Sequence, residues 1–405
     1  MLEYEEALAC ILAVIPPVQP ERVPILRAHQ RILAEEILAP LDLPPFDNSA
    51  MDGYAVRAED LAGATAESPV PLRLCGRIAA GDVFTGALAA GTCARIFTGS
   101  PIPAGADAVV MQEDTLEDPA GPGRALIRDS VKPWENVRFR GEDVKRGARV
   151  AHAGEELGLG GVSLLAALGI AEIVAGRQPV AGVLATGSEL VEGGQPLPAG
   201  AIYESNRVAL AALLAQAGAV PKMFPLVKDT AAGTRQALAD AFASCDLVIT
   251  SGGVSVGEMD FVKDAFTELG GELQFWKVAI RPGRPFVFGR WKGKFLFGLP
   301  GNPVSAFVTF LLLVRPALRR WQGAPNPGLP RQPATLSEPV VNRADRRHFV
   351  RVRVDEQGRA RPSGLQASHI LSSLALANGL LDVPPQTTLL AGTSVSVLRF
   401  DFQGG

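Results

Sequence analysis

The chain has 405 residues, of which 47% are hydrophobic and 20% are charged, and its formal net charge is −3. This is the composition of a globular protein of about two to four domains, and the near-neutral charge argues against general affinity for nucleic acid. The acidic N-terminus is unlike a signal peptide and the longest apolar run, residues 306–314, is too short to cross a bilayer, so we expect a cytoplasmic protein without membrane contact.

The first half of the chain predicts a helical region interrupted by a small β domain. Helical spacing covers residues 3–15, 29–36 and 159–168, and Gly169 ends the third segment. Between the second and third helices, short apolar segments recur between glycines and prolines, as is typical of strands. The expected strands are residues 71–78, 92–98, 108–112, 125–127 and 137–139.

From about residue 178 to 322, apolar segments and helical patterns alternate, which predicts a doubly wound α/β domain with a parallel sheet. Asn302 and Pro303 have the residue types of an N-cap and a first helical position, so a long helix should start there. Alternation over residues 348–354 and 393–400 predicts a separate C-terminal β domain. The expected α/β strands are 180–185, 222–227, 247–250, 273–280, 286–288 and 295–298, and the other helices are 206–216, 230–244 and 261–269.

The stretch TSGGVSVGEMD, residues 250–260, carries the clearest functional signal. A strand opens there into a loop of small residues that ends at a helix start, and backbone N–H groups at such a place favour anions. Two loops of similar character, residues 277–284 and 298–305, also follow strands. Together, the three loops predict the ligand-binding edge of an open α/β sheet.

Acidic residues follow several of the expected strands, at Glu189, Asp229 and Asp260. Carboxylates at this edge could hold Mg²⁺ together with substrate phosphates. Alternatively, Asp229 and Asp260 could simply cap the helices that they precede, and Glu189 could be a solvated loop residue.

Cationic residues gather in the loop 277–284, at Lys277, Arg281 and Arg284. They could clamp phosphate or another oxyanion, or they could belong to a solvated loop. The β domain contains an unusual segment, residues 44–56, which we interpret as a functional loop rather than a strand. An ordinary turn at Asp52 is the alternative.

Other catalytic classes lack their motifs. The four cysteines and four histidines are scattered, which excludes a zinc-type cluster and disfavours disulfides. Ser188 lies in TGSE rather than in a G-x-S-x-G motif, and the chain contains neither a Walker A loop nor G-x-G-x-x-G.

Taken together, these segments resemble the molybdopterin molybdenumtransferases of molybdenum cofactor synthesis, a family related to the C-terminal domain of gephyrin. The matching segments occur in family order and cover most of the chain. They are residues 46–56 (FDNSAMDGYAV), 97–103 (FTGSPIP), 140–143 (RGED), 186–190 (TGSEL), 251–260, 275–277 (FWK), 298–305 (GLPGNPVS) and 368–370 (SHI).

The resemblance implies a multidomain fold of α/β and β parts. An elongated helical region (residues 1–44 and 146–177) would carry an inserted β domain (45–145). A doubly wound α/β domain of molybdopterin-binding type (178–326) and a C-terminal β-barrel (327–405) would follow.

The resemblance also implies insertion of molybdate into adenylylated molybdopterin, with Mg²⁺-assisted release of AMP. The implied catalytic residues are Asp52, Asp143, Glu189, Asp260, Lys277 and Arg281, and the implied metal ligands are Glu189, Asp229 and Asp260. The implied substrate contacts are Thr98, Ser251, Gly252, Gly253, Ser255, Arg284, Pro300, Asn302 and Ser368. The family often has lysine where this chain has Arg281 and Arg284, which exchanges a point charge for a fork of donors.

The family forms homodimers, so the resemblance implies a site between the α/β domain of one subunit and the β domain of the other. It also suggests contact with molybdopterin adenylyltransferase and with cofactor-accepting enzymes. Two alternative functions stay open: a non-catalytic molybdopterin-binding scaffold, as in gephyrin-like relatives, and a molybdopterin adenylyltransferase. The five acidic residues argue against the scaffold, and the inserted β domain and tail argue against the adenylyltransferase.

Overall fold

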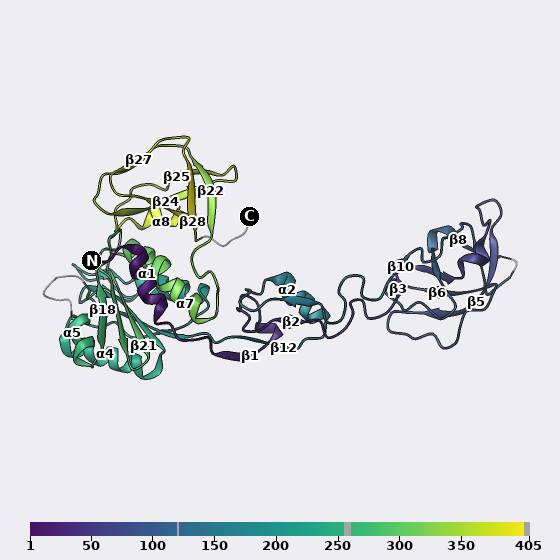
Figure 1. The fold of residues 1–405 in the computed structure, drawn as a ribbon, viewed down its shortest axis with the longest axis horizontal. Coiled ribbons are helices and arrows are strands. Elements are labelled where there is room, and N and C mark those ends of the chain that lie inside the picture. Colours follow the sequence, from purple (N-terminus) through teal and green to yellow (C-terminus); the bar gives the residue numbers. More distant parts are fainter. Residues whose placement is uncertain (120, 255–260, 401–405) are drawn as a thin grey trace.

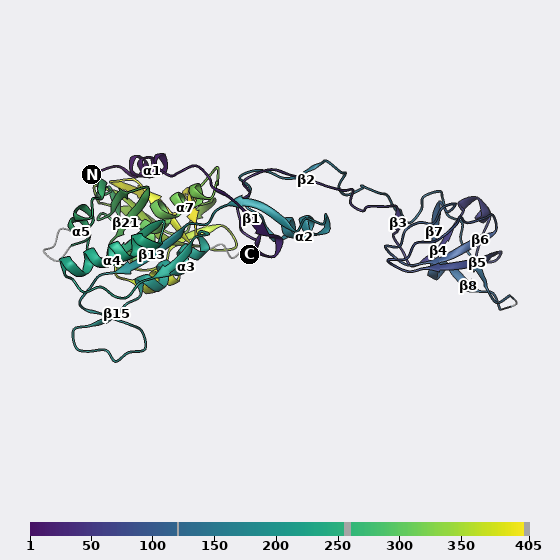
Figure 2. The ribbon, with the colours of Figure 1, turned by 90° about the horizontal axis from the view of Figure 1, so that it is seen from below.

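The computed structural model of the chain describes residues 1–119, 121–254 and 261–400. The molecule is elongated, with the inserted β domain at one end and the α/β domain and C-terminal barrel at the other (Figure 1). Figure 2 shows from a second direction that a slender region of paired segments separates the two ends. No helix in the described part of the chain has both the length and the apolar character needed to cross a bilayer.

The α/β domain is built on a six-stranded sheet whose central strands β13 and β17 are almost wholly buried. Apolar runs of this kind are typical of parallel strands covered on both faces. The strand order is β16 (Val220–Met223), β13 (Val180–Ala185), β17 (Leu247–Ser251), β21 (Lys294–Leu299), β20 (Val287–Trp291) and β18 (Glu272–Trp276).

The prediction of an all-parallel sheet is wrong for β18 and β20, which run antiparallel to their neighbours. Only Lys292 and Gly293 connect β20 to β21, and both have positive φ angles, of 48° and 79°. Such a two-residue turn makes a hairpin, because a parallel connection needs a crossover of about a dozen residues.

Helices cover both faces of this sheet, as the doubly wound pattern predicts. On one face, α4 (Ala231–Ser244) and α5 (Val262–Glu268) bury Phe242 and Phe266 against the strands. The other face packs against α3 (Asn206–Gln216) and one continuous helical segment that starts after Asn302. That segment comprises α6 (Pro303–Thr309), the π-helical turn η4 (Phe310–Val314) and α7 (Arg315–Trp321).

The N-terminal helix α1 (Tyr4–Ala13) also belongs to this second face, because Ala7 and Ile11 are fully buried in the same apolar cluster as the helices above. The slender region therefore starts after α1. It is held by antiparallel pairs more than by helices, although α2 (Leu159–Ala167) forms as predicted. The pairs are β1 (Pro20–Pro24) with β12 (Glu172–Gly176) and β2 (Ile37–Leu38) with β11 (Arg149–Ala151). A further pair, β3 (Asn48–Ser49) with β10 (Val137–Arg138), lies where the slender region meets the inserted β domain (Figure 1).

The helix predicted over residues 29–36 is wrong. The N–H of Leu33 donates to the Glu155 carbonyl at 2.9 Å and that of Ala34 donates to the Val174 carbonyl at 3.0 Å. These backbone groups bond to segments more than a hundred residues away, so tertiary pairing overrides the local helical spacing.

The inserted β domain has a six-stranded sheet, and β4 (Gly53–Val56), second from one edge, lies in the segment that we interpreted as a loop. That interpretation is wrong for these four residues. A Cβ on Gly53 would lie 1.8 Å from the Val110 carbonyl oxygen, so glycine is required for this close pairing. The order is β7 (Ala108–Met111), β4, β6 (Thr92–Ile96), β5 (Val70–Ile78), β9 (Arg124–Ile127) and β8 (Thr115–Glu117).

The C-terminal domain is a closed five-stranded barrel, as expected from the resemblance. The strands follow the order β24, β25, β22, β28, β26, and β26 pairs with β24 to close the ring. A short strand of the α/β domain, β19 (Ile280–Arg281), adds to β24 in parallel. The barrel strands are β22 (Arg331–Leu336), β24 (Arg347–Val354), β25 (Arg359–Pro362), β26 (Gly379–Val383) and β28 (Ser394–Arg399).

The start of α4 gives a testable prediction. Thr230 is its N-cap, and its hydroxyl accepts from the Gly233 N–H at 3.2 Å. Thr230→Ala should lower the free energy of unfolding by about 1 kcal/mol, whereas Thr230→Ser should keep most of it. The midpoint of the denaturant transition that includes α4 measures this, and equal midpoints for wild type and the alanine variant would contradict the cap.

Candidate active site

The carboxyl ends of β13, β17 and β21 meet around a cavity of about 320 Å³. This is the edge of the sheet at which an open α/β fold binds its ligand. Six of the residues that the sequence singled out line the cavity: Glu189, Asp229, Gly252, Gly253, Pro300 and Asn302. Loops that follow four different strands, β13, β16, β17 and β21, therefore contribute to one site.

A second cavity, of about 610 Å³, adjoins the first, and Thr186, Glu189, Gly301 and Asn302 line both. Ser251 lines this second cavity. Its walls also include Tyr203 and His369, which come from the strand pair after Glu189 and from the loop before α8 (Leu371–Ala375).

Glycine is obligatory at the start of the loop after β17. Gly252 and Gly253 have φ angles of 88° and 67°, which side chains rarely allow. A Cβ on Gly252 would lie 2.7 Å from the Thr186 carbonyl oxygen, and one on Gly253 would lie 2.7 Å from Val262. The small residues thus let two loops approach closely. The predicted site residues Ser255 and Asp260 lie outside the described part of the chain.

Asn206 and Thr186 are site residues that sequence reasoning missed. The Asn206 side-chain amide donates to the Ser251 hydroxyl and to the Gly301 carbonyl, both at 2.7 Å, and so ties two loops together. The Thr186 hydroxyl is buried and has no hydrogen-bond partner among the described residues. Thr186 belongs to the TGSE segment, which was the available signal, whereas Asn206 lies in no motif.

Asp229 does not cap α4, because Thr230 does. Instead, its carboxylate accepts a hydrogen bond from the Ser188 N–H at 2.8 Å, while its own N–H donates to the Ser188 hydroxyl at 3.2 Å. This reciprocal pair holds the half-buried Asp229 beside the exposed Glu189 in the wall of the first cavity. The structure thus offers two carboxylates at one cavity.

The cationic residues lie near this edge, but no hydrogen bond or ion pair links Lys277, Arg281 and Arg284 to one another among the described residues. The Lys277 ammonium lies 3.8 Å from the centroid of the Trp276 ring. Arg281 and Arg284 are exposed, and Arg284 precedes Pro285, which lines the first cavity.

The barrel lies directly beside Arg281, because Arg281 is in register with His348 of β24. Burial lowers the pKa of His348 to about 4, and the charges of Arg281 and Arg351 add to this effect. The barrel thus presents a neutral imidazole to the cationic loop. Ser368 lies near the start of α6, where its carbonyl accepts from the Val304 N–H at 3.2 Å.

Asp52 and Thr98 form a second group, in the inserted β domain. One Asp52 carboxylate oxygen accepts from the Thr98 N–H at 2.7 Å and from its hydroxyl at 2.8 Å. These bonds hold the pKa of Asp52 below its usual value. Asp143 is exposed and lies near the end of the slender region, where its N–H donates to the Leu43 carbonyl. The β domain and the adjoining end of the slender region, which carry these three residues, lie far from the α/β domain within one chain (Figure 1).

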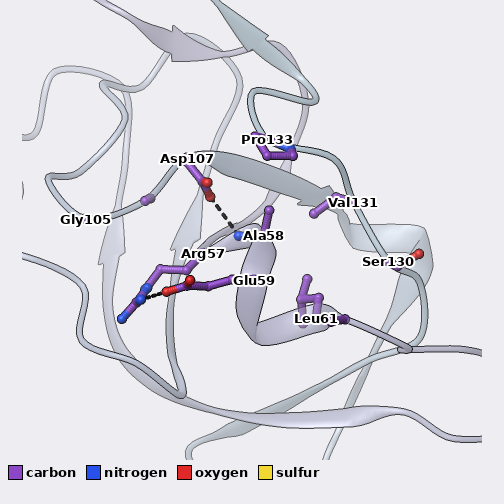
Figure 3. Close-up of a pocket in the computed structure, with 11 residues that line it drawn as sticks. Arg57, Ala58, Glu59, Leu61, Gly105, Asp107, Ser130, Val131 and Pro133 are labelled. Atoms are coloured by element: carbon purple, nitrogen blue, oxygen red, sulfur yellow. Dashed lines mark hydrogen bonds and ion pairs between the residues drawn. The ribbon is translucent and has the colours of Figure 1, made fainter.

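The β domain also has a cavity of its own, of about 600 Å³ (Figure 3). Its walls include the apolar side chains of Ala58, Leu61 and Val131. The Asp107 carboxylate in this wall accepts a hydrogen bond from the Ala58 N–H at 2.7 Å and so satisfies this backbone donor. No predicted site residue lines this cavity.

Comparison with known proteins covers nearly the whole chain. Three family models match: the MoeA N-terminal region (domain I and II) over residues 2–169, a probable molybdopterin binding domain over 182–320, and the MoeA C-terminal region (domain IV) over 333–400. Molybdopterin molybdenumtransferase 2 of Mycobacterium tuberculosis is 42% identical over 98% of this chain and 99% of its own length. Molybdopterin molybdenumtransferase of Haemophilus influenzae is 40% identical over 99% of both chains.

A solved structure has the same fold. The molybdopterin biosynthesis MoeA protein from Pyrococcus horikosii superposes with a TM-score of 0.81 at 34% identity and covers 100% of both chains. Full-length similarity at this level, together with the three consecutive family models, confirms the resemblance found in the sequence. The chain belongs to the MoeA family of molybdopterin molybdenumtransferases.

Proposed function

We propose that the chain inserts molybdate into adenylylated molybdopterin and releases AMP, which gives the molybdenum cofactor. The observation that carries this proposal is the cavity at the carboxyl ends of β13, β17 and β21, in a chain whose relatives are named for this reaction. The relatives match over the inserted β domain and the barrel as well, so the whole architecture supports the same function.

The site must bring anions together, because molybdate and the phosphates of the substrate are all negatively charged. The backbone at Gly252 and Gly253 and the side chains of Thr186 and Asn302 offer polar groups that can orient the phosphate-bearing part. Lys277, Arg281 and Arg284 supply positive charge beside the same edge, where they would hold molybdate.

The two carboxylates fit a bound Mg²⁺. Glu189 and Asp229 line one cavity, and no cluster of three or more acidic, histidine or cysteine side chains occurs within residues 1–119, 121–254 and 261–400. Mg²⁺ is usually held by one or two carboxylates together with substrate phosphates, so two suffice, and Asp260 is the proposed third ligand. When bound, the ion would neutralise charge on the phosphate bridge and make AMP a better leaving group.

We further propose that the active form is a homodimer, in which Asp52, Thr98 and Asp143 complete the α/β site of the partner subunit. Within one chain, the slender region keeps the two groups apart (Figure 1). Phe46 and Met51, in the same segment as Asp52, are large apolar side chains that are 42% and 41% exposed, as expected of a surface that another subunit covers. Molybdopterin adenylyltransferase and cofactor-accepting enzymes are the expected further partners.

Reconstitution tests the function directly. The purified chain, adenylylated molybdopterin, Mg²⁺ and molybdate should activate an apo-molybdoenzyme and release AMP. Formation of adenylylated product from ATP and molybdopterin would instead identify an adenylyltransferase, and binding without turnover in either assay would identify a scaffold.

Asp229→Asn separates a role in metal binding from a structural role. Asparagine can still accept the hydrogen bond from Ser188 but carries no charge, so the melting temperature should stay the same. Turnover should fall by roughly 10²-fold or more, as when a catalytic electrostatic contact is lost, and should need more Mg²⁺. Asp240→Asn, an exposed change on α4, is the matched control. Normal turnover and Mg²⁺ dependence in Asp229→Asn would remove this carboxylate from the site.

Mixing two impaired variants tests the shared site. Asp52→Asn and Asp229→Asn should each lose roughly 10²-fold or more of the activity as homodimers but keep a measurable residual rate. In a mixed dimer, one of the two sites combines two wild-type surfaces, so equal mixing should restore about one quarter of wild-type activity. A mixture that forms heterodimers yet keeps only this residual rate would show that each chain builds its own site.

Arg281→Ala tests the cationic loop. If Arg281 binds molybdate, the molybdate concentration for half-maximal rate should rise several-fold, with an unchanged melting temperature because surface substitutions usually alter stability by less than about 0.5 kcal/mol. Arg281→Lys should retain most of the affinity if a point charge suffices. Arg290→Ala, at an exposed position of β20, serves as the control. An unaltered molybdate dependence in Arg281→Ala would exclude this residue from the oxyanion site.

A further inference from the structure

The turn that carries Asp52 is held by an arginine that no sequence motif pointed to. Arg95 lies on β6, in register with Tyr54 of β4. One of its terminal nitrogens donates to the Gly53 carbonyl at 2.8 Å, and the other donates to the side-chain carbonyl of Gln112. The Gln112 N–H in turn donates to the Asp52 carbonyl at 2.9 Å. Arg95 therefore bridges the two segments that hold the backbone of Asp52.

The same guanidinium packs between two aromatic rings. It lies 5.1 Å from the centroid of Tyr54 and 5.0 Å from that of Phe97. Phe97 precedes Thr98, whose two hydrogen bonds orient the Asp52 carboxylate. Arg95 thus contacts Gly53 and Tyr54, which follow Asp52 in the chain. It also contacts Phe97, which precedes the residue that donates to the Asp52 carboxylate.

Neighbouring residues already supply the apolar core at this end of the sheet, because Ala55, Ala94 and Ile96 are fully buried. Arg95 is only half-buried, and no carboxylate forms an ion pair with it among the described residues. Its forked donors instead reach one backbone carbonyl and one side-chain carbonyl, which a lysine cannot bridge in the same way. Arg95 therefore fixes the conformation of the turn that carries Asp52 and contributes little to the apolar core.

We propose that Arg95 is a positioning residue for the reaction, which fixes the orientation of the Asp52 carboxylate through the Gly53 carbonyl, Gln112 and Phe97. The proposal rests on the proposed role of Asp52. Because Asp52 would serve the site of the partner subunit, Arg95 would set the geometry of a site to which its own α/β domain does not contribute.

The chain contains a matched control. Arg77 of the neighbouring strand β5 is in register with Arg95 and lies 4.8 Å from the same Phe97 ring centroid, but among the described residues it makes no hydrogen bond to the Asp52 turn. Arg77→Gln and Arg95→Gln therefore remove the same charge from neighbouring positions. Only the second removes the bridge to Gly53 and Gln112.

The test measures kcat, KM and melting temperature of the dimeric enzyme in the reconstitution assay. Arg95→Gln should lower kcat by roughly 10-fold to 10²-fold, the size expected from a misplaced catalytic group, with little change in the KM for adenylylated molybdopterin. Arg95→Lys keeps the charge and the aliphatic stem, so it should fold normally and still lose most of the kcat. Arg77→Gln should leave kcat within about twofold, since surface changes usually cost little.

A double-mutant cycle shows whether Arg95 acts through Asp52. The double variant Asp52→Asn with Arg95→Gln should be no slower than Asp52→Asn alone, because the second change disturbs a group that the first has already disabled. The positioning role would be overturned if the defects of Asp52→Asn and Arg95→Gln multiplied in the double variant. Equal losses of kcat in Arg77→Gln and Arg95→Gln, or a normal kcat in Arg95→Lys, would also overturn it. Full activity of Asp52→Asn would instead overturn the proposed site, whereas a strongly impaired Asp52→Asn with a normal Arg95→Gln would overturn this inference alone.

Discussion

Parallel pairing of β13 with β17 and of β17 with β21 is the constraint on which the α/β site depends. Parallel strands end at the same edge of a sheet, so the loops after Ala185, Ser251 and Leu299 have to meet there. Close approach then requires Gly252 and Gly253, whose conformations and lack of side chains let the loop touch Thr186. The cavity and its Glu189 carboxylate follow from this arrangement of three strand ends, and Asp229 joins them from the loop after β16.

The remainder of the chain places the proposed site residues in two distant parts of a long molecule. Helix α1 is anchored on the α/β domain, and the chain then runs out and back through the antiparallel pairs β1–β12 and β2–β11 to carry the β domain. These segments share a small apolar cluster that includes Val23, Leu33 and Ile173, and their backbone groups bond to each other and keep the region extended. If Asp52 and Asp229 serve one reaction, as we propose, the distance between them within one subunit requires that they meet across two chains.

Sequence patterns predicted the elements whose signals are local. The start of the long helix after Asn302, the buried strands β13 and β17 and the barrel alternation in β24 all follow from residue type and spacing. The helix expected over residues 29–36 failed because its backbone bonds to Glu155 and Val174, which no local pattern reveals. Strand β4 was missed because Gly53 looks like a turn residue until its pairing partner is known, and Asp229 resembled a helix cap until Thr230 was seen to occupy that position. The family resemblance supplied site residues that spacing alone left undecided.

Strand β19 joins two domains that otherwise look separable. Ile280 and Arg281 belong to the α/β domain in sequence, yet their backbone extends the barrel at β24. The barrel therefore supports the loop that carries the cationic residues, and it is not structurally independent of the α/β domain. Exchanging barrels between relatives would succeed only if this dipeptide and its β24 partners were transferred together, so the natural unit of recombination in this fold crosses the apparent domain boundary.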